Sequence, residues 1–111
     1  MKEIDLGHRG FNTEEARSEL FSEIEAAKDS GVCALKIIHG YGSGGHGGGV
    51  RSAVRSTLAS MRRNGRIRCV IFGERWLGHD DVPQILDSCP KFQRDKQLMR
   101  QDPGVTIVLL A

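Results

Sequence analysis

The chain of 111 residues lacks several features that would place it in a membrane or in a secreted, crosslinked class. No apolar run approaches the roughly 20 residues of a membrane-spanning helix, and no apolar signal segment follows the N-terminus. The three cysteines, Cys33, Cys69 and Cys89, form no C-x-x-C pair, unlike those of a zinc ribbon or a disulfide scaffold. We therefore expect a cytoplasmic single domain with no membrane partner, and ordinary buried thiols.

Acidic residues are missing from one long block of the sequence. Residues 30–73 contain no Asp or Glu, whereas residues 1–29 hold eight acids and four bases. The cations of the block are Lys36, Arg51, Arg55, Arg62, Arg63, Arg66 and Arg68. A one-sided charge of this kind favours a polyanionic partner such as nucleic acid. The alternative is a solvated helix face that happens to be rich in arginine.

Hydrophobic spacing predicts alternating strands and helices. Strand-like runs occupy 3–6, 32–38, 68–72 and 104–110. Asn12 and Glu15 form a capping-box pattern that predicts a helix ending at Gly31. A second helix is expected over about 49–64. Parallel strands joined by right-handed helical crossovers that step in one direction place both helices on the same face of a sheet, which predicts a two-layer α/β domain.

Residues 74–103 form a long connection before the last strand. They include apolar residues such as Trp76, Ile85, Phe92 and Leu98, so the segment has something to bury. We expect an insertion of partial helix that acts as a mobile flap, and no fifth strand. His79, Asp80 and Asp81 could suggest a metal site, although a solvated turn is favoured.

A glycine-rich loop, His39 to Gly49, connects the second strand to the second helix. Successive glycine amides and a helix N-terminus can hold an anion. A P-loop is excluded because no lysine occurs in 37–90. The pattern Gly40-x-Gly42-x-x-Gly45 matches a dinucleotide fingerprint only weakly, because no acid lies about 20 residues further on.

Three stretches in the right order resemble the Smr (small MutS-related) domain family. They are "IDLGHRGFNTEEA", "IIHGYGSGGHGGGVRSAVRSTL" and "GVTIVLL". In the family, an L-D-L-H-G strand, an H-G-x-G-x-G loop with an early helix arginine, and a final T-I-V-rich strand occur in this order. The resemblance covers nearly the whole chain except 74–103, and indicates one Smr-like domain over residues 1–111.

The resemblance implies a β-α-β-α-β-β sandwich with a four-stranded sheet and two main helices on one face, like the C-terminal domain of translation initiation factor three. It also implies nucleic-acid binding, with endonuclease activity on DNA or RNA. The positions carried over are catalytic Asp5, His8 and His39, and phosphate-binding Gly40, Tyr41, Gly42, Ser43, Gly44, Arg51 and Arg55. Gly7 occupies the family's histidine position with His8 one residue later, and Tyr41 replaces a residue that is often basic.

These residues could support phosphodiester cleavage. Asp5 could act as a base or bind a metal ion, and His8 or His39 could transfer a proton. The sequence specifies no cofactor: a divalent metal is compatible with it but is not required if an RNA 2′-OH is the nucleophile. Tyr41 and Trp76 could stack on bases, although packing is favoured for Trp76.

Three hypotheses follow. The first is an Smr-like endonuclease. The second is a non-catalytic module that binds structured nucleic acid or a ribosome. A larger parent protein is a further candidate partner, since Smr domains often lie at the end of longer chains. The third is a nucleotide-binding or protein-interaction module in which the arginines are incidental.

Overall fold

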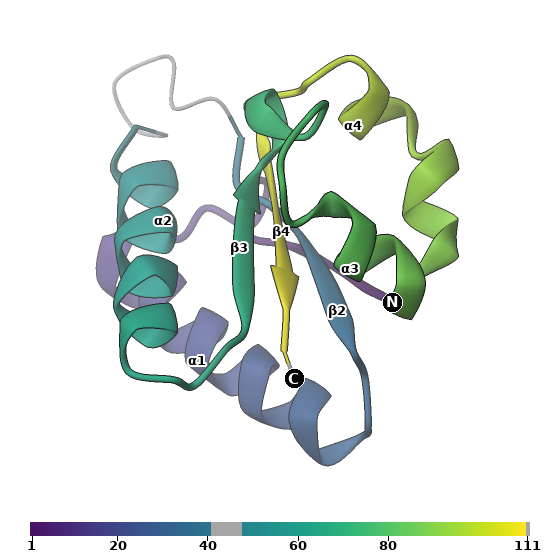
Figure 1. Ribbon diagram of the computed structural model, residues 1–111. Helices are drawn as coiled ribbons and strands as arrows, with labels where there is room; N and C mark the ends of the chain where they lie inside the picture. Colours follow the sequence, from purple (N-terminus) through teal and green to yellow (C-terminus); the bar gives the residue numbers. More distant parts are fainter. Residues whose placement is uncertain (41–47, 111) are drawn as a thin grey trace.

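Four strands form one mixed sheet in the computed structural model, which describes residues 1–40 and 48–110 (Figure 1). The strands lie in the spatial order β1 (Lys2–Asp5), β2 (Ala34–Ile38), β4 (Val105–Leu109) and β3 (Cys69–Phe72). β1 and β2 are parallel, and β4 is antiparallel to both β2 and β3. The ends of β1, β2 and β3 and the beginning of β4 therefore share one edge of the sheet, called the C-terminal edge below.

The two main helices, α1 (Thr13–Asp29) and α2 (Gly48–Arg63), cover one face of the sheet, as predicted (Figure 1). α1 begins with the expected capping box. The side chain of Asn12 accepts a hydrogen bond from the Glu15 amide at 2.8 Å, and the Glu15 carboxylate accepts one from the Asn12 amide at 3.0 Å. After α1, Gly31 adopts φ +74°, a conformation that favours glycine. The local signals thus placed this helix correctly.

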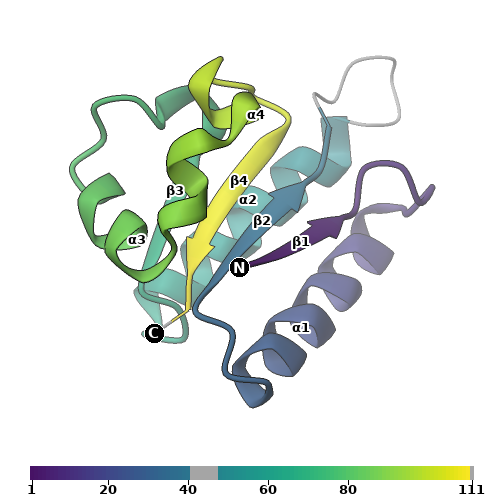
Figure 2. The same cartoon turned by 90° about the vertical axis from the view of Figure 1, so that its right-hand side faces the viewer.

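Short helices between β3 and β4 cover the opposite face of the sheet (Figure 2). They are η1 (Gly73–Arg75), α3 (Val82–Ser88), η2 (Pro90–Arg94) and α4 (Lys96–Met99). The helical content predicted for 74–103 is confirmed, but the mobile flap is wrong. Trp76, Ile85, Phe92 and Leu98 are fully buried in a second hydrophobic core, which makes the segment an integral layer.

Two further contacts fix this layer to the sheet. The Lys36 ammonium, from the middle of β2, lies 2.8 Å from the Asp95 carboxylate at the start of α4. At Gly73 there is no room for a side chain, because a Cβ would lie 2.0 Å from the Asp102 carbonyl oxygen. The chain can therefore leave β3 and turn onto the second face only with glycine at this position.

The cysteine prediction is partly wrong. Cys69 and Cys89 are buried free thiols, whereas Cys33 is exposed because it precedes β2. Among the described residues, no helix is long and apolar enough to cross a membrane. The predicted loop residues Tyr41, Gly42, Ser43 and Gly44 lie outside the described residues.

Candidate functional site

Backbone hydrogen bonds join the first motif to the start of the glycine-rich loop at the C-terminal edge. The amides of Leu6 and Gly7 both donate to the carbonyl of Ile38, at 2.7 and 3.0 Å. The amides of His39 and Gly40 both donate to the carbonyl of Gly104, at 3.0 and 3.1 Å. The segments that carry the first motif, the start of the loop and the start of β4 therefore meet at this edge, although they are distant in the sequence.

Gly7 lies directly against the backbone that begins the loop. A Cβ at this position would lie 2.9 Å from the carbonyl carbon of His39 and 3.1 Å from the amide nitrogen of Gly40. A side chain here would push β1 away from β2. The structure thus gives a physical reason for glycine at this position.

His8 forms a close pair with Asp5 at the end of β1. The His8 Nδ1 lies 2.7 Å from the Asp5 Oδ2, while the Asp5 Oδ1 accepts hydrogen bonds from the amides of Gly7 and His8. Partial burial acts to raise the pKa of Asp5, but the hydrogen bonds from His8 and Gly7 outweigh it and lower the pKa. An ionised Asp5 requires Nδ1 to carry the proton, which leaves Nε2 of a neutral ring as a proton acceptor.

The Asp5–His8 pair is accessible. The side chain of His8 is 78% exposed and that of Asp5 is 41% exposed. Three backbone and side-chain donors fix the carboxylate, and the carboxylate in turn orients the ring. An oriented imidazole beside a carboxylate is an arrangement that can transfer protons to or from a bound substrate.

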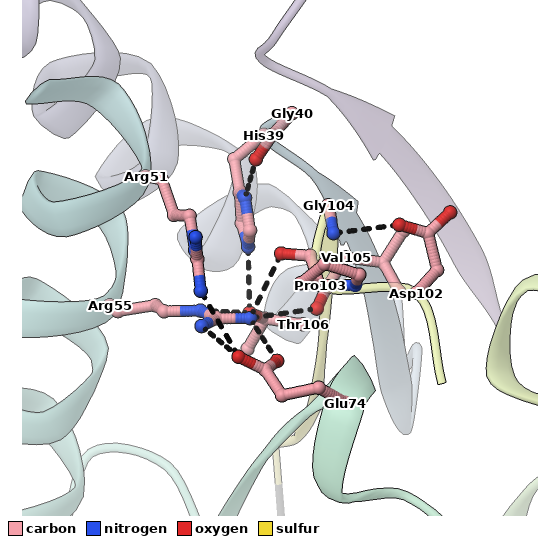
Figure 3. Close-up of polar contacts among 10 residues, drawn as sticks. All are labelled: His39, Gly40, Arg51, Arg55, Glu74, Asp102, Pro103, Gly104, Val105 and Thr106. Carbon is pink, nitrogen blue, oxygen red and sulfur yellow. Dashed lines mark hydrogen bonds and ion pairs between the residues drawn. The ribbon is translucent and has the colours of Figure 1, made fainter. Parts of the chain in front are cut away.

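His39, in contrast, is buried and hydrogen-bonded at both ring nitrogens (Figure 3). Its Nδ1 donates to the Gly40 carbonyl at 2.9 Å, so its Nε2 accepts from the Thr106 hydroxyl at 2.8 Å. Burial lowers the pKa of His39 to about 4, and the nearby charges of Arg55 and Arg51 act in the same direction. His39 is thus a neutral group that connects the start of the loop to β4.

Arg55 extends this network below His39 (Figure 3). Its Nε donates to the Thr106 hydroxyl at 3.2 Å, and its two terminal nitrogens bind both carboxylate oxygens of Glu74 at 2.9 and 2.7 Å. The guanidinium also lies 4.0 Å from the ring centre of Phe72. Through these partners, the buried Arg55 joins α2 to β4 and η1. Its contact with phosphate stays a prediction.

Glu74 is the site residue that the sequence motifs did not identify. It accepts hydrogen bonds from Arg55 and, at 3.1 Å, from Arg51. Partial burial acts to raise the pKa of Glu74, but hydrogen bonds and charges, above all from Arg55, outweigh it and lower the pKa. One signal was available: Glu74 is the first acid after the block of residues 30–73 that has none.

The remaining sequence candidates lie away from this edge or have structural roles. Trp76 is buried against Phe92, with ring centres 6.0 Å apart, so it packs as favoured from the sequence. The His79 Nδ1 accepts a hydrogen bond from the Asp81 amide at 3.0 Å, as in an ordinary turn. No group of three or more His, Cys, Asp or Glu side chains in residues 1–40 and 48–110 is placed to hold a metal ion.

A family model described as the Smr domain matches residues 4–73, from Ile4 in β1 to Gly73 directly after β3. The chain belongs to the Smr domain family. This family is associated with nucleic-acid binding and endonuclease activity. The match includes the Asp5–His8 pair, the glycine-rich loop, and both Arg51 and Arg55.

A solved structure supports the same assignment. The crystal structure of the Smr domain of Thermus thermophilus MutS2 is similar to this chain, with a TM-score of 0.60 and 25% sequence identity. The alignment covers 100% of this chain and 99% of that one, so it also spans the helical segment between β3 and β4. A comparison with curated proteins found no significant match.

Proposed function

We propose that this Smr domain binds structured DNA or RNA and cleaves its phosphodiester backbone, with His8 as the proton-transfer group and Asp5 as its orienting carboxylate. The observation that carries the proposal is the exposed 2.7 Å contact between the Asp5 carboxylate and the His8 ring at the edge where the glycine-rich loop begins. An ion pair that served only to stabilise the surface would not need to lie beside the start of the glycine-rich loop.

The chemistry follows from the hydrogen-bonding pattern. With RNA, the His8 Nε2 takes the proton of a ribose 2′-OH while that oxygen attacks the adjacent phosphorus. The bond from phosphorus to the 5′ oxygen breaks, and the leaving oxygen takes a proton from water. With DNA, a water molecule replaces the 2′-OH as the nucleophile and passes its proton to the same nitrogen.

His39 has a positioning role in this proposal. Its low pKa leaves it neutral at physiological pH, and both of its ring nitrogens are engaged within the protein. It holds the Gly40 carbonyl and thereby the first residue of the loop. The predicted phosphate contacts of Gly40, the loop residues up to Gly44, and Arg51 remain part of the proposal.

The second candidate function is a nucleic-acid or ribosome-binding module without cleavage. A specific observation favours it: two of the predicted site side chains, His39 and Arg55, are buried in a network that joins the strands. Of the three predicted catalytic side chains, only Asp5 and His8 then remain accessible for chemistry. The two candidate functions therefore differ in whether substitution of Asp5 or His8 abolishes a cleavage activity.

The experiment compares wild type with Asp5→Asn and His8→Gln on supercoiled DNA and on structured RNA, with and without a chelator. Asp87→Asn and His79→Gln, which lie in or beside the layer on the opposite face, are the matched controls. The endonuclease proposal expects both site variants to lose at least about tenfold in cleavage, in line with general acid–base catalysis, with binding retained. Tight binding with no cleavage by wild type would favour the binding module, and cleavage unchanged in both variants would exclude this pair.

A further inference from the structure

The positive charge of the chain is not concentrated at the C-terminal edge. Of the cations in residues 30–73, Lys36 pairs with Asp95, while Arg51 and Arg55 both pair with Glu74. The exposed Asp5 adds a further negative charge to that edge. The loop residues 41–47 contain no Lys, Arg, Asp or Glu, so the sequence of the loop does not alter this balance.

The other four arginines of the block gather at the opposite end of α2. Arg62 and Arg63 close the helix, and Arg66 and Arg68 follow in the turn that leads to β3. We call these four residues the arginine turn. All four are exposed, and none forms an ion pair with an acidic side chain in the described part of the chain.

Stabilisation of the helix explains only part of this cluster. Arg62 and Arg63 interact favourably with the C-terminal end of the helix dipole. Arg66 and Arg68 lie beyond the helix and gain nothing comparable. Four like charges within seven residues repel one another, which disfavours the cluster unless an anion neutralises it.

The surface around the arginine turn also offers neutral hydrogen-bonding groups. Arg66 lines a hollow of about 370 Å³ between α1 and the end of α2, together with Ser60 and Asn64. On the β3 side, Arg62 and Arg63 line a second hollow with the half-buried Phe72. Arginine, serine and asparagine side chains are common donors to the phosphates and sugars of nucleic acids.

We propose that the arginine turn is a second binding surface for the phosphate backbone of nucleic acid, separate from the C-terminal edge. The 16 residues of α2 span about 24 Å at 1.5 Å per residue, a length of B-form duplex that carries about 14 phosphate charges. Contact with the arginine turn and with the start of α2 at the C-terminal edge therefore requires a duplex of at least this length. This inference rests on the nucleic-acid binding in the proposed function, but not on cleavage.

Salt dependence of binding tests the location of these contacts. The test variant carries Arg62→Gln, Arg63→Gln and Arg66→Gln. The control carries Lys91→Gln, Arg94→Gln and Lys96→Gln, which remove the same charge from exposed positions on the opposite face. Affinity for a labelled duplex of about 20 base pairs is measured across salt concentrations, and circular dichroism and thermal melting verify that both variants fold. Each lost phosphate contact makes the slope of log K against log salt about 0.9 less negative.

We expect the arginine variant to have a slope about 2 to 3 units less negative than wild type, and the control to keep most of the wild-type slope. Equal slopes in the arginine variant and wild type would overturn the inference. Equal reductions in both variants would also overturn it, because they would show an effect of net charge alone.

Cleavage measured on the same variants separates this inference from the proposed function. If the arginine variant cleaves more slowly at low substrate but at the wild-type rate at saturation, both hold. If wild type does not cleave but the slope still changes, the cleavage proposal fails and the second surface stands. If wild type cleaves and the slope does not change, only the second surface fails, and if wild type binds no nucleic acid, both fail.

Discussion

His39 links the stability of the domain to pH, because the folded protein holds it as a neutral, buried ring. Its folded pKa is about 4, compared with an ordinary value of 6.5. Because the folded value is the lower one, the unfolded chain binds the proton more readily. The stability contributed by neutral His39 is therefore complete above pH 6.5, declines as the pH falls, and is lost below about pH 4.

The size of this effect follows from the two pKa values. The full shift corresponds to roughly 3 kcal/mol, and the part lost between pH 7.5 and pH 5 is about 2 kcal/mol. The lowered pKa values of Asp5 and Glu74 act mainly at more acidic pH, since both carboxylates stay ionised in the folded state at pH 5. The interval from pH 7.5 to 5 thus reports mainly on His39.

Urea unfolding monitored by circular dichroism at pH 7.5, 6 and 5 measures the free energy of unfolding. We expect wild type to lose about 2 kcal/mol over this range and His39→Gln to be less stable at pH 7.5 but much less sensitive to pH. A flat wild-type profile, or an unchanged slope in His39→Gln, would refute the structural role assigned to His39.

Three other perturbations test the packing and charge of the site. Gly73→Ala should destabilise the domain by about 1–3 kcal/mol or more in urea unfolding, because its Cβ would overlap the Asp102 carbonyl; an effect near zero would show that the turn after β3 can relax. Trp76→Ala should cost about 3–5 kcal/mol, whereas a loss below about 1 kcal/mol would restore the mobile-flap hypothesis. Glu74→Gln should lower stability, because Arg55 loses a charged partner, and should raise affinity for a duplex in binding assays, because the C-terminal edge becomes more positive. Weaker binding by that variant, with its fold intact, would contradict the charge balance described for the edge.

Local sequence signals were sufficient for the main elements of the fold. The Asn12–Glu15 capping box and Gly31 mark the two ends of α1, since each acts through contacts a few residues apart. The buried strand before the glycine-rich loop is likewise evident from its apolar run, which only Lys36 interrupts. The order of the strands was not predictable in this way, because the placement of β4 between β2 and β3 depends on contacts distant in the sequence.

The roles of the site residues depended on such distant contacts as well. The sequence around His39 does not show that its ring would be buried and hydrogen-bonded to Thr106. Likewise, the sequence around Arg55 does not show that Glu74 would bind its guanidinium. The Asp5–His8 pair is local, but the close fit of Gly7 against the loop backbone beside it depends on a segment distant in the sequence. The Smr motifs therefore located the C-terminal edge, while the tertiary contacts distinguish the buried side chains there from the exposed pair.

Chemical rescue tests most directly whether the Asp5–His8 pair carries out the proposed cleavage. His8→Ala leaves Asp5 in place and opens a position beside it that is accessible to solvent, since the His8 side chain is 78% exposed. Cleavage of structured RNA or supercoiled DNA is measured at saturating substrate with increasing imidazole. The proposal predicts that His8→Ala is nearly inactive and that imidazole restores its activity in proportion to concentration, with no such effect on His79→Ala. Full activity of His8→Ala without imidazole would contradict it.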